Sequence, residues 1–158
     1  WKGLADGTIQ TVSTDHCSFT TEQKKLGEGD FTKIPGGMPG AETRGTLIYT
    51  YGVDKGRITK EDMCRVLSEN PAKLYGLYPR KGVIAPGSDA DLVIMRTGVE
   101  DVITAKDQVQ NVDYAPFEGT KVTGRVESVF LRGLQAVKDG KVVEEKKGEF
   151  LKRGKYAL

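Results

Sequence analysis

Three residues with reactive or metal-binding side chains stand together near the start of the chain, where the sequence reads TVSTDHC. They are Asp15, His16 and Cys17, and His16 is the only histidine in the 158 residues. They end a run rich in β-branched residues, so we expect them to emerge where a buried strand from Thr8 to Ser13 gives way to a loop. Barrel enzymes keep their catalytic groups at such strand ends.

The types and spacing of these residues argue against several kinds of site. Neighbours on a strand point to opposite faces, so Asp15 and Cys17 share a side that His16 leaves, and a nucleophilic triad is not expected. A closed structural zinc site needs about four Cys or His ligands, and the chain has two cysteines and one histidine. An isolated aspartate is more often a turn or cap residue, and a lone histidine more often forms a hydrogen bond near a site or in the core than ligates a metal.

A glycine-rich loop, GGMPGAETRG, begins at Gly36. It lacks the Gly-Lys-Ser/Thr ending of a phosphate-binding loop, and it follows a proline instead of a strand. We therefore interpret it as a loop that exposes its backbone, and not as a nucleotide site. For the nearby cations Lys24, Lys25 and Arg44 we expect a solvated surface position, with loop anchoring as the alternative.

The charge balance and hydropathy limit the partners. Lys and Arg number 24 against 22 acidic residues, a formal net charge of +2, which favours neither nucleic acid nor an anionic membrane. No apolar stretch approaches the roughly 20 residues that cross a bilayer, and no secretion-signal pattern opens the chain. We expect a cytoplasmic protein in which Cys17 and Cys64 are buried, reduced thiols.

Helical spacing follows the loop of residues 18–40. We expect one helix to end at Gly52, because glycine accepts the left-handed conformation of a helix end. The next begins at Thr59, which forms a capping box with Asp62. The residues of that helix that face the core are expected to be Met63, Val66 and Leu67.

A further helix is expected from Asn70 to Gly76, with Asn70 as its N-cap and Gly76 as its stop. Leu74 and Tyr75 are expected to lie inside.

The hydrophobic period changes to two after Gly82, which indicates an antiparallel sheet and not a βαβ unit. We expect a short strand, a turn at Pro86-Gly87, a second strand over Asp91–Met95, and a later hairpin at Asp139-Gly140. Residues 99–124 lack periodicity and are expected to be irregular. The charged tail either frays or docks on a partner subunit.

Several stretches, taken in order, resemble the carboxy-terminal third of the dihydropyrimidinase and D-hydantoinase family of cyclic amidohydrolases. They read STDHCSFTTEQK, GDFTKIPGGMPGAETR, NPAKLYGLYPRKGVIAPGSDADLVI, NVDYAPFEG and GRVESVFLRG. The resemblance covers Trp1 to Arg153, and TDHCSF with the following QK separates this branch from allantoinases and dihydroorotases. Because the first methionine is Met38, we expect the chain to be a fragment of a longer protein.

The resemblance implies an α/β fold made of two parts. Residues 1–81 would form the carboxy-terminal part of a (β/α)₈ metal-dependent hydrolase barrel, with its last strand and helices. Residues 82–145 would supply antiparallel strands of a small β-sandwich. The tail, residues 146–158, would contact a partner subunit in a homotetramer.

The resemblance also implies a site. Such enzymes hold two zinc ions bridged by a carboxylated lysine, which has no counterpart in this chain. Asp15 would ligate one zinc and act as general base, and the backbone of Gly36 and Gly37 would hold the ring of a cyclic ureide. His16 would support the site without ligating the metal. Family members commonly read Pro-Asn-Gly where this chain has Pro35-Gly36-Gly37, so a side chain is missing at that point.

The implied reaction is hydrolysis of a dihydropyrimidine or 5-substituted hydantoin to an N-carbamoyl amino acid. With only one of the metal ligands, the chain alone is expected to be inactive. Two alternatives are a non-catalytic dihydropyrimidinase-related scaffold that binds proteins, and a self-standing β-rich binding module. Retention of Asp15 favours the enzyme over the scaffold.

Overall fold

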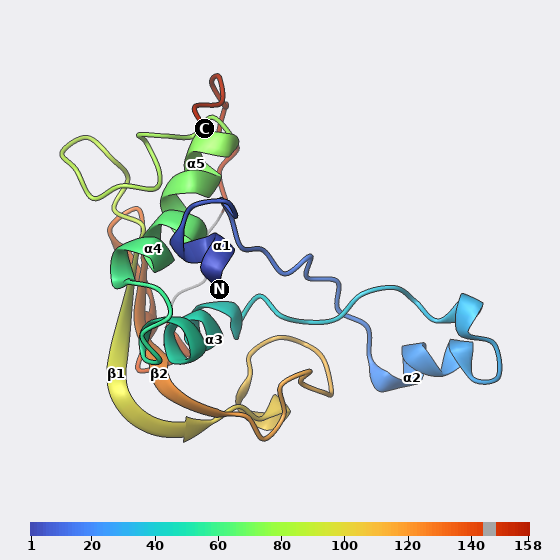
Figure 1. Cartoon of the computed structure of the whole chain (residues 1–158). Coiled ribbons are helices and arrows are strands. Elements are labelled where there is room, and N and C mark those ends of the chain that lie inside the picture. The colour runs from blue at the N-terminus through green and yellow to red at the C-terminus, as the bar shows by residue number, and fades with distance from the viewer. Residues whose placement is uncertain (144–147) are drawn as a thin grey trace.

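A computed structural model of the chain describes residues 1–143 and 148–158 (Figure 1). Short helices pack on one antiparallel sheet to form the body of the molecule. An arm, residues 13–42, extends away from this body and carries α2 (Thr21–Lys24) at its far end. No helix in the described ranges is long and apolar enough to span a bilayer.

The helices of the body are short and joined by wider turns. α1 spans Lys2–Ala5, α3 spans Arg44–Ile48 and continues as a π-helical turn over Tyr49–Val53, and α4 (Lys60–Cys64) runs through a π-helical turn (Arg65–Glu69) into α5 (Asn70–Leu74).

The predicted capping box at the start of α4 is confirmed. Thr59 Oγ1 accepts a hydrogen bond from the Asp62 amide at 3.0 Å, and the Asp62 carboxylate accepts one from the Thr59 amide at 3.0 Å. Arg65 then donates to the other Asp62 oxygen at 2.7 Å. The first amides of a helix have no carbonyl partner within it. Side chains therefore satisfy two backbone donors at the start of α4.

Two predicted helix boundaries are wrong, and packing explains both. Gly52 lies inside the π-helical turn, where a Cβ would come within 2.7 Å of the Trp1 ring, so glycine is needed there for contact and not for a helix end. Asn70 is no N-cap, because the helix continues through it. Its buried side-chain amide donates to the backbone oxygen of Gln10 at 2.8 Å.

The predicted stop at Gly76 is confirmed by its φ of 67°. The expected burial of Leu74 and Tyr75 is wrong, since these side chains are 41% and 59% exposed. They lie at the carboxy-terminal end of α5, where they line an open hollow beside the tail.

The sheet has the order β1-β2-β3-β4 with antiparallel pairing throughout. Its strands are β1 (Leu92–Val102), β2 (Lys121–Leu131), β3 (Leu134–Lys138) and β4 (Lys141–Val142). Asp139 and Gly140 both have positive φ, 49° and 73°, which confirms the hairpin turn between β3 and β4. The four strands form a single sheet, so the β-sandwich stays a prediction.

Other strand predictions need correction. No strand precedes the turn at Pro86-Gly87, and β1 runs on to Val102 because its partner β2 already begins at Lys121. The irregular connection is therefore residues 103–120, shorter than the predicted 99–124. It includes one 3-10 turn, Ala105–Asp107.

The strand expected over Thr8–Ser13 does not form. A strand needs a neighbour to pair with, and in this segment the Val12 amide donates to the carbonyl oxygen of Val66, a helical residue, at 3.1 Å. The described residues provide no strand beside it. The barrel that the resemblance implies is accordingly not seen, and the division at residue 81 stays a prediction.

Two small hydrophobic clusters hold the body together. One joins Leu4, Ile58 and Val66 under the helices, and the other joins Ile103, Ala115 and Val122 between β2 and the connection 103–120. Gly124 of β2 has no room for a Cβ, which would lie 2.5 Å from the Tyr49 ring. Helix and sheet therefore meet at close range there.

The tail was expected to fray or to dock on a partner. It does not fray at residues 154–157, where it lies against α5 of the same chain, and its contact with a partner subunit stays a prediction. The amide of Gly154 donates to the Gly76 oxygen at 2.7 Å, and that of Ala157 donates to the Lys73 oxygen at 3.0 Å. The last two residues of the predicted segment 82–145 and the first two of the predicted tail 146–158 lie outside the described residues.

Truncation of the most buried side chain tests the first cluster. Val66 is 0% exposed, so Val66→Ala should lower the free energy of unfolding by about 2 kcal/mol through lost burial and a cavity. Val93, which is 60% exposed, is the control, and Val93→Ala should change it by less than about 0.5 kcal/mol. Chemical denaturation measures both. Equal losses would mean that the cluster does not support the fold.

The capping box gives stability a pH dependence. The Arg65 guanidinium, helped by the hydrogen bonds of Thr59, lowers the pKa of Asp62 from 3.8 to about 2. The stabilisation from the ionised Asp62 carboxylate is therefore fully present above about pH 4, and it is lost as the pH falls toward 2. We expect the Tm difference between the native chain and Asp62→Asn to be largest near pH 6 and to shrink between pH 4 and pH 2. A difference that is constant with pH would contradict this.

Candidate functional site

Asp15 lies on the arm in an unusual backbone conformation. Its φ is 46°, in the left-handed region that non-glycine residues adopt rarely and that aspartate tolerates better than most. The side chain is exposed and forms no hydrogen bond or ion pair with any residue that the structure describes. The expected alternative, a carboxylate that caps a turn, is therefore not what the geometry favours, and the group is free for a ligand.

His16 connects the two sides of the arm. Its Nδ1 accepts hydrogen bonds from the amides of Gly40 at 3.0 Å and Ala41 at 3.2 Å. A ring nitrogen that accepts carries no proton, so the neutral ring has its proton on Nε2. We considered two positions for His16, a hydrogen-bonded one near a site and one in the core. The side chain is exposed and accepts hydrogen bonds, so it is not in the core.

The segment with Asp15 runs beside the glycine loop. The Cys17 amide donates to the Met38 oxygen at 3.3 Å. A Cβ on Gly37, whose φ is 120°, would lie 2.5 Å from Cys17 Cβ. The structure therefore brings three of the predicted site residues together, namely Asp15, His16 and Gly37. Gly36, the fourth, has nothing within 4 Å of its Cβ position and faces open space.

The cysteines differ from the expectation, because Cys17 and Cys64 are both exposed. Cys17 lies on the arm, which has too little packing to cover it. Cys64 lies on the outer side of α4, opposite the stripe that includes Val66. The prediction of buried thiols is therefore wrong.

Two of the three cations near the loop hold backbone carbonyl groups, which is the alternative considered for them and not the expected solvated position. Lys24 Nζ donates to the carbonyl oxygens of Pro35 and Gly37. Arg44 donates to the Val12 oxygen at 3.3 Å, so it too anchors a loop. Lys25 instead pairs with Glu22 on the surface, as expected.

Two acidic side chains tie the arm to the connection 103–120. Glu42 accepts from the amides of Val109 at 3.0 Å and Gln110 at 3.1 Å. Asp113 accepts from the Thr21 amide at 2.8 Å, and this hydrogen bond lowers the pKa of Asp113. The partners are more than sixty residues apart in sequence, so no local pattern reveals these contacts.

The described residues do not form a metal site by themselves. No group of three or more His, Cys, Asp or Glu side chains in residues 1–143 and 148–158 is placed to hold an ion. Asp15 has the oxygen donors that a divalent ion accepts, but one carboxylate does not complete a coordination shell. Its chemistry in this chain is limited to accepting hydrogen bonds or a proton.

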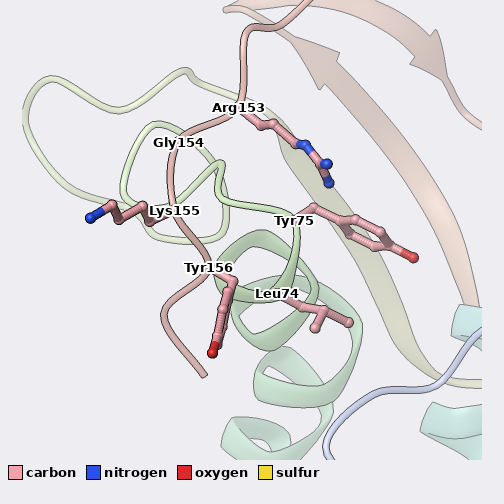
Figure 2. A pocket seen from close by; sticks show the side chains of 6 residues that line it. All are labelled: Leu74, Tyr75, Arg153, Gly154, Lys155 and Tyr156. Atoms are coloured by element: carbon pink, nitrogen blue, oxygen red, sulfur yellow. The ribbon is translucent and has the colours of Figure 1, made fainter.

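One hollow lies away from these residues. It has a volume of about 730 Å³ and is formed where the tail crosses the end of α5, lined by Leu74, Tyr75 and residues 153–156 (Figure 2). A second, of about 570 Å³, lies along the connection 103–120 and includes Asp113 and Glu118. Neither includes a residue expected to act in catalysis, so we do not assign the site to them.

Comparison with known proteins places this geometry in context. The model of the amidohydrolase family matches residues 1–143. The chain is 49% identical over 158 residues to a D-hydantoinase of Geobacillus stearothermophilus, with 99% of this chain and 34% of the relative covered. It is 47% identical over 138 residues to a D-hydantoinase of Streptomyces coelicolor, with 87% and 29% covered.

Solved structures give the same result. A D-hydantoinase from Bacillus sp. AR9 superposes with a TM-score of 0.96 at 45% identity, over 100% of this chain and 35% of that one. An L-hydantoinase (dihydropyrimidinase) from Arthrobacter aurescens gives a TM-score of 0.85 at 37% identity, over 92% and 32%. The chain therefore spans about a third of the length of the relatives it matches.

Removal of the His16 acceptor tests the connection across the arm. In His16→Ala the amides of Gly40 and Ala41 should exchange with solvent up to about tenfold faster, as expected for a lost hydrogen bond of about 1 kcal/mol. His16→Asn, whose side-chain oxygen still accepts, should show a smaller effect. NMR-detected exchange measures both, with the Asp62 amide, bound to Thr59, as internal control. Unchanged rates at Gly40 and Ala41 would exclude the contact.

Proposed function

The chain belongs to the amidohydrolase family, and we propose that it is part of an enzyme that hydrolyses the ring amide of cyclic ureides. The observation that carries this proposal is the unpaired carboxylate of Asp15, held in a strained conformation beside an open glycine loop. A strained backbone conformation costs free energy and tends to persist where a function uses it. The identity with hydantoinases over nearly the whole chain supports the same reaction.

We propose that Asp15 moves the proton in this reaction. Hydrolysis of a ring amide adds a water oxygen to the carbonyl carbon and breaks the C–N bond, and one water proton ends on the released nitrogen. A carboxylate beside that carbon can accept the proton and then deliver it. Asp15 suits the task because no described residue competes for its oxygens.

The backbone of Gly36 and Gly37 is proposed to hold the ureide ring. Glycine lets a ligand approach the main chain closely, and the space around Gly36 is open. His16 is proposed to maintain the distance between Asp15 and this loop, since it bonds to Gly40 and Ala41 on the opposite side of the arm. The products would be N-carbamoyl amino acids, from dihydropyrimidines or 5-substituted hydantoins.

The whole enzyme is proposed to use zinc, as two ions bridged by a carboxylated lysine that this chain lacks. Bound zinc lowers the pKa of a water ligand and polarises a carbonyl. The described residues do not fit a complete zinc site, because Asp15 is the single ligand they offer and no cluster surrounds it. By this proposal the chain alone is inactive. A homotetramer and a cytoplasmic location stay predictions.

The proposal can be tested by exchanging this chain for the matching third of the Geobacillus stearothermophilus D-hydantoinase, to give what we call the exchange enzyme. It should hydrolyse hydantoin. Asp15→Asn should lower kcat by about 10²–10⁴-fold, the usual contribution of a general acid-base group. Asp54, an exposed carboxylate outside the arm, is the matched control, and Asp54→Asn should leave kcat unchanged.

Metal analysis of the same proteins gives a second measurement. If Asp15 is a ligand, Asp15→Asn should retain less zinc than Asp54→Asn after dialysis. A well-folded exchange enzyme without turnover would instead favour the non-catalytic scaffold. Full activity of Asp15→Asn would remove the proposed role of this carboxylate.

A further inference from the structure

Lys24, the last residue of α2, has its ammonium group between two carbonyl groups of the glycine loop. Nζ lies 2.5 Å from the Pro35 oxygen and 2.6 Å from the Gly37 oxygen. It also lies 5.3 Å from the centre of the Phe19 ring, within range of a cation-π contact. The side chain is half-buried on an arm that otherwise has little packing.

The next residue, Lys25, shows how unusual this position is. Its ammonium pairs with Glu22 at 2.8 Å, and the two side chains are 59% and 81% exposed. Such a surface ion pair contributes about 0–1 kcal/mol. Lys24 has no carboxylate partner among the described residues, and its hydrogen bonds go to the main chain. Its role is therefore the geometry of the loop and not neutralisation of an acid.

The helix that carries Lys24 is itself held in place. Thr20 and Gln23 form a capping box, with the Gln23 amide bound to Thr20 Oγ1 at 3.2 Å and the Thr20 amide bound to Gln23 Oε1 at 2.7 Å. The Thr21 amide is bound by Asp113. Three of the four residues before Lys24 are therefore anchored, so its side chain starts from a defined position.

The two carbonyl groups fix the direction of two amides. In a trans peptide the C=O and N–H bonds point in opposite directions, and the one cis peptide among the described residues is Tyr78-Pro79. Because the Pro35 and Gly37 carbonyls point to Lys24, the amides of Gly36 and Met38 point away from it. Neither amide donates to any part of the chain that the structure describes. An unpaired N–H in an open loop is ready to bind an acceptor.

We propose that Lys24 is a positioning residue that orients the Gly36 amide toward a carbonyl oxygen of the ureide substrate. This inference rests on the proposed function, since the backbone of Gly36 is there assigned to the substrate ring. Lys24 does not touch the substrate. It holds the carbonyl side of the Pro35–Gly36 peptide plane, and the amide on the other side of that plane would contact the substrate.

The first test uses the chain itself and needs no activity. Lys24→Gln shortens the side chain and removes its charge, so the amide NMR signals of Gly36 and Met38 should shift and their order parameters should fall. Lys25→Gln, the matched control, should leave both signals unchanged. Neither hydrophobic cluster includes Lys24, so the Tm should be unaffected by either change. A loss of Tm as large as that of Val66→Ala would show a merely structural role and overturn the proposal.

The second test measures kinetics in the exchange enzyme. Lys24→Gln should raise KM for hydantoin by about tenfold with little change in kcat, because a bond that holds the bound substrate is weakened. Lys24→Arg keeps two donors and should recover part of this loss, whereas Lys25→Gln should match the parent. Equal KM values for Lys24→Gln and Lys25→Gln would overturn the proposal. An exchange enzyme that is inactive with Lys24 intact would contradict the proposed function instead, and the NMR test would then decide the role of Lys24.

Discussion

Every peptide group of the arm carries an acceptor, and all except those before Pro35 and Pro39 also carry a donor. Regular structure in the arm is limited to α2 and two 3-10 turns, Lys25–Gly27 and Phe31–Lys33, so most of these groups find no partner in it. Side chains bind several of them instead. His16 accepts from two amides, Lys24 donates to two carbonyls, and Glu42 accepts from two amides of the distant connection. These hydrogen bonds join segments that are apart in the sequence, so they restrict the path that the arm follows. The position of the candidate site depends on them.

The body of the molecule is held in a different way. One cluster buries apolar side chains among the helices, and the other lies between β2 and the connection 103–120. Glycines allow close contacts, as Gly52 does against Trp1 and Gly124 against Tyr49. Apolar packing is dense and tolerates little change. Hydrogen bonds on an exposed arm contribute less each and open more easily. The chain therefore joins a packed support to a site segment that local polar contacts hold in place.

The candidate site on the arm is incomplete, and this agrees with the chain covering about a third of its relatives' length. Asp15 has a strained backbone and free oxygens but no second ligand nearby, and the Gly36 amide donates to no residue that the structure describes. Each is one half of an interaction. The chain covers about a third of the length of its relatives and supplies only these single groups to the proposed site. The remaining groups of that site would come from outside this chain.

The sequence by itself determined the features that depend on neighbours in the chain. The capping box of Thr59 and Asp62, the stop at Gly76 and the turn at Asp139-Gly140 are local hydrogen-bond and φ preferences, so residue types are enough to predict them. Asp15, His16 and the glycine loop were likewise found as candidates from their types. Burial of the cysteines and the strand over Thr8–Ser13 were predicted wrongly, because exposure and strand pairing depend on neighbours that local patterns do not specify.

Only the tertiary structure decided which distant groups meet. That His16 bonds to Gly40, that Asn70 turns inward to Gln10 instead of capping a helix, and that Lys24 rather than Lys25 holds the loop follow from the path of the chain in space. Two adjacent lysines look the same to any sequence pattern. They differ because Lys24 faces two carbonyl oxygens whereas Lys25 pairs with Glu22 on the surface, and this is a property of the folded backbone.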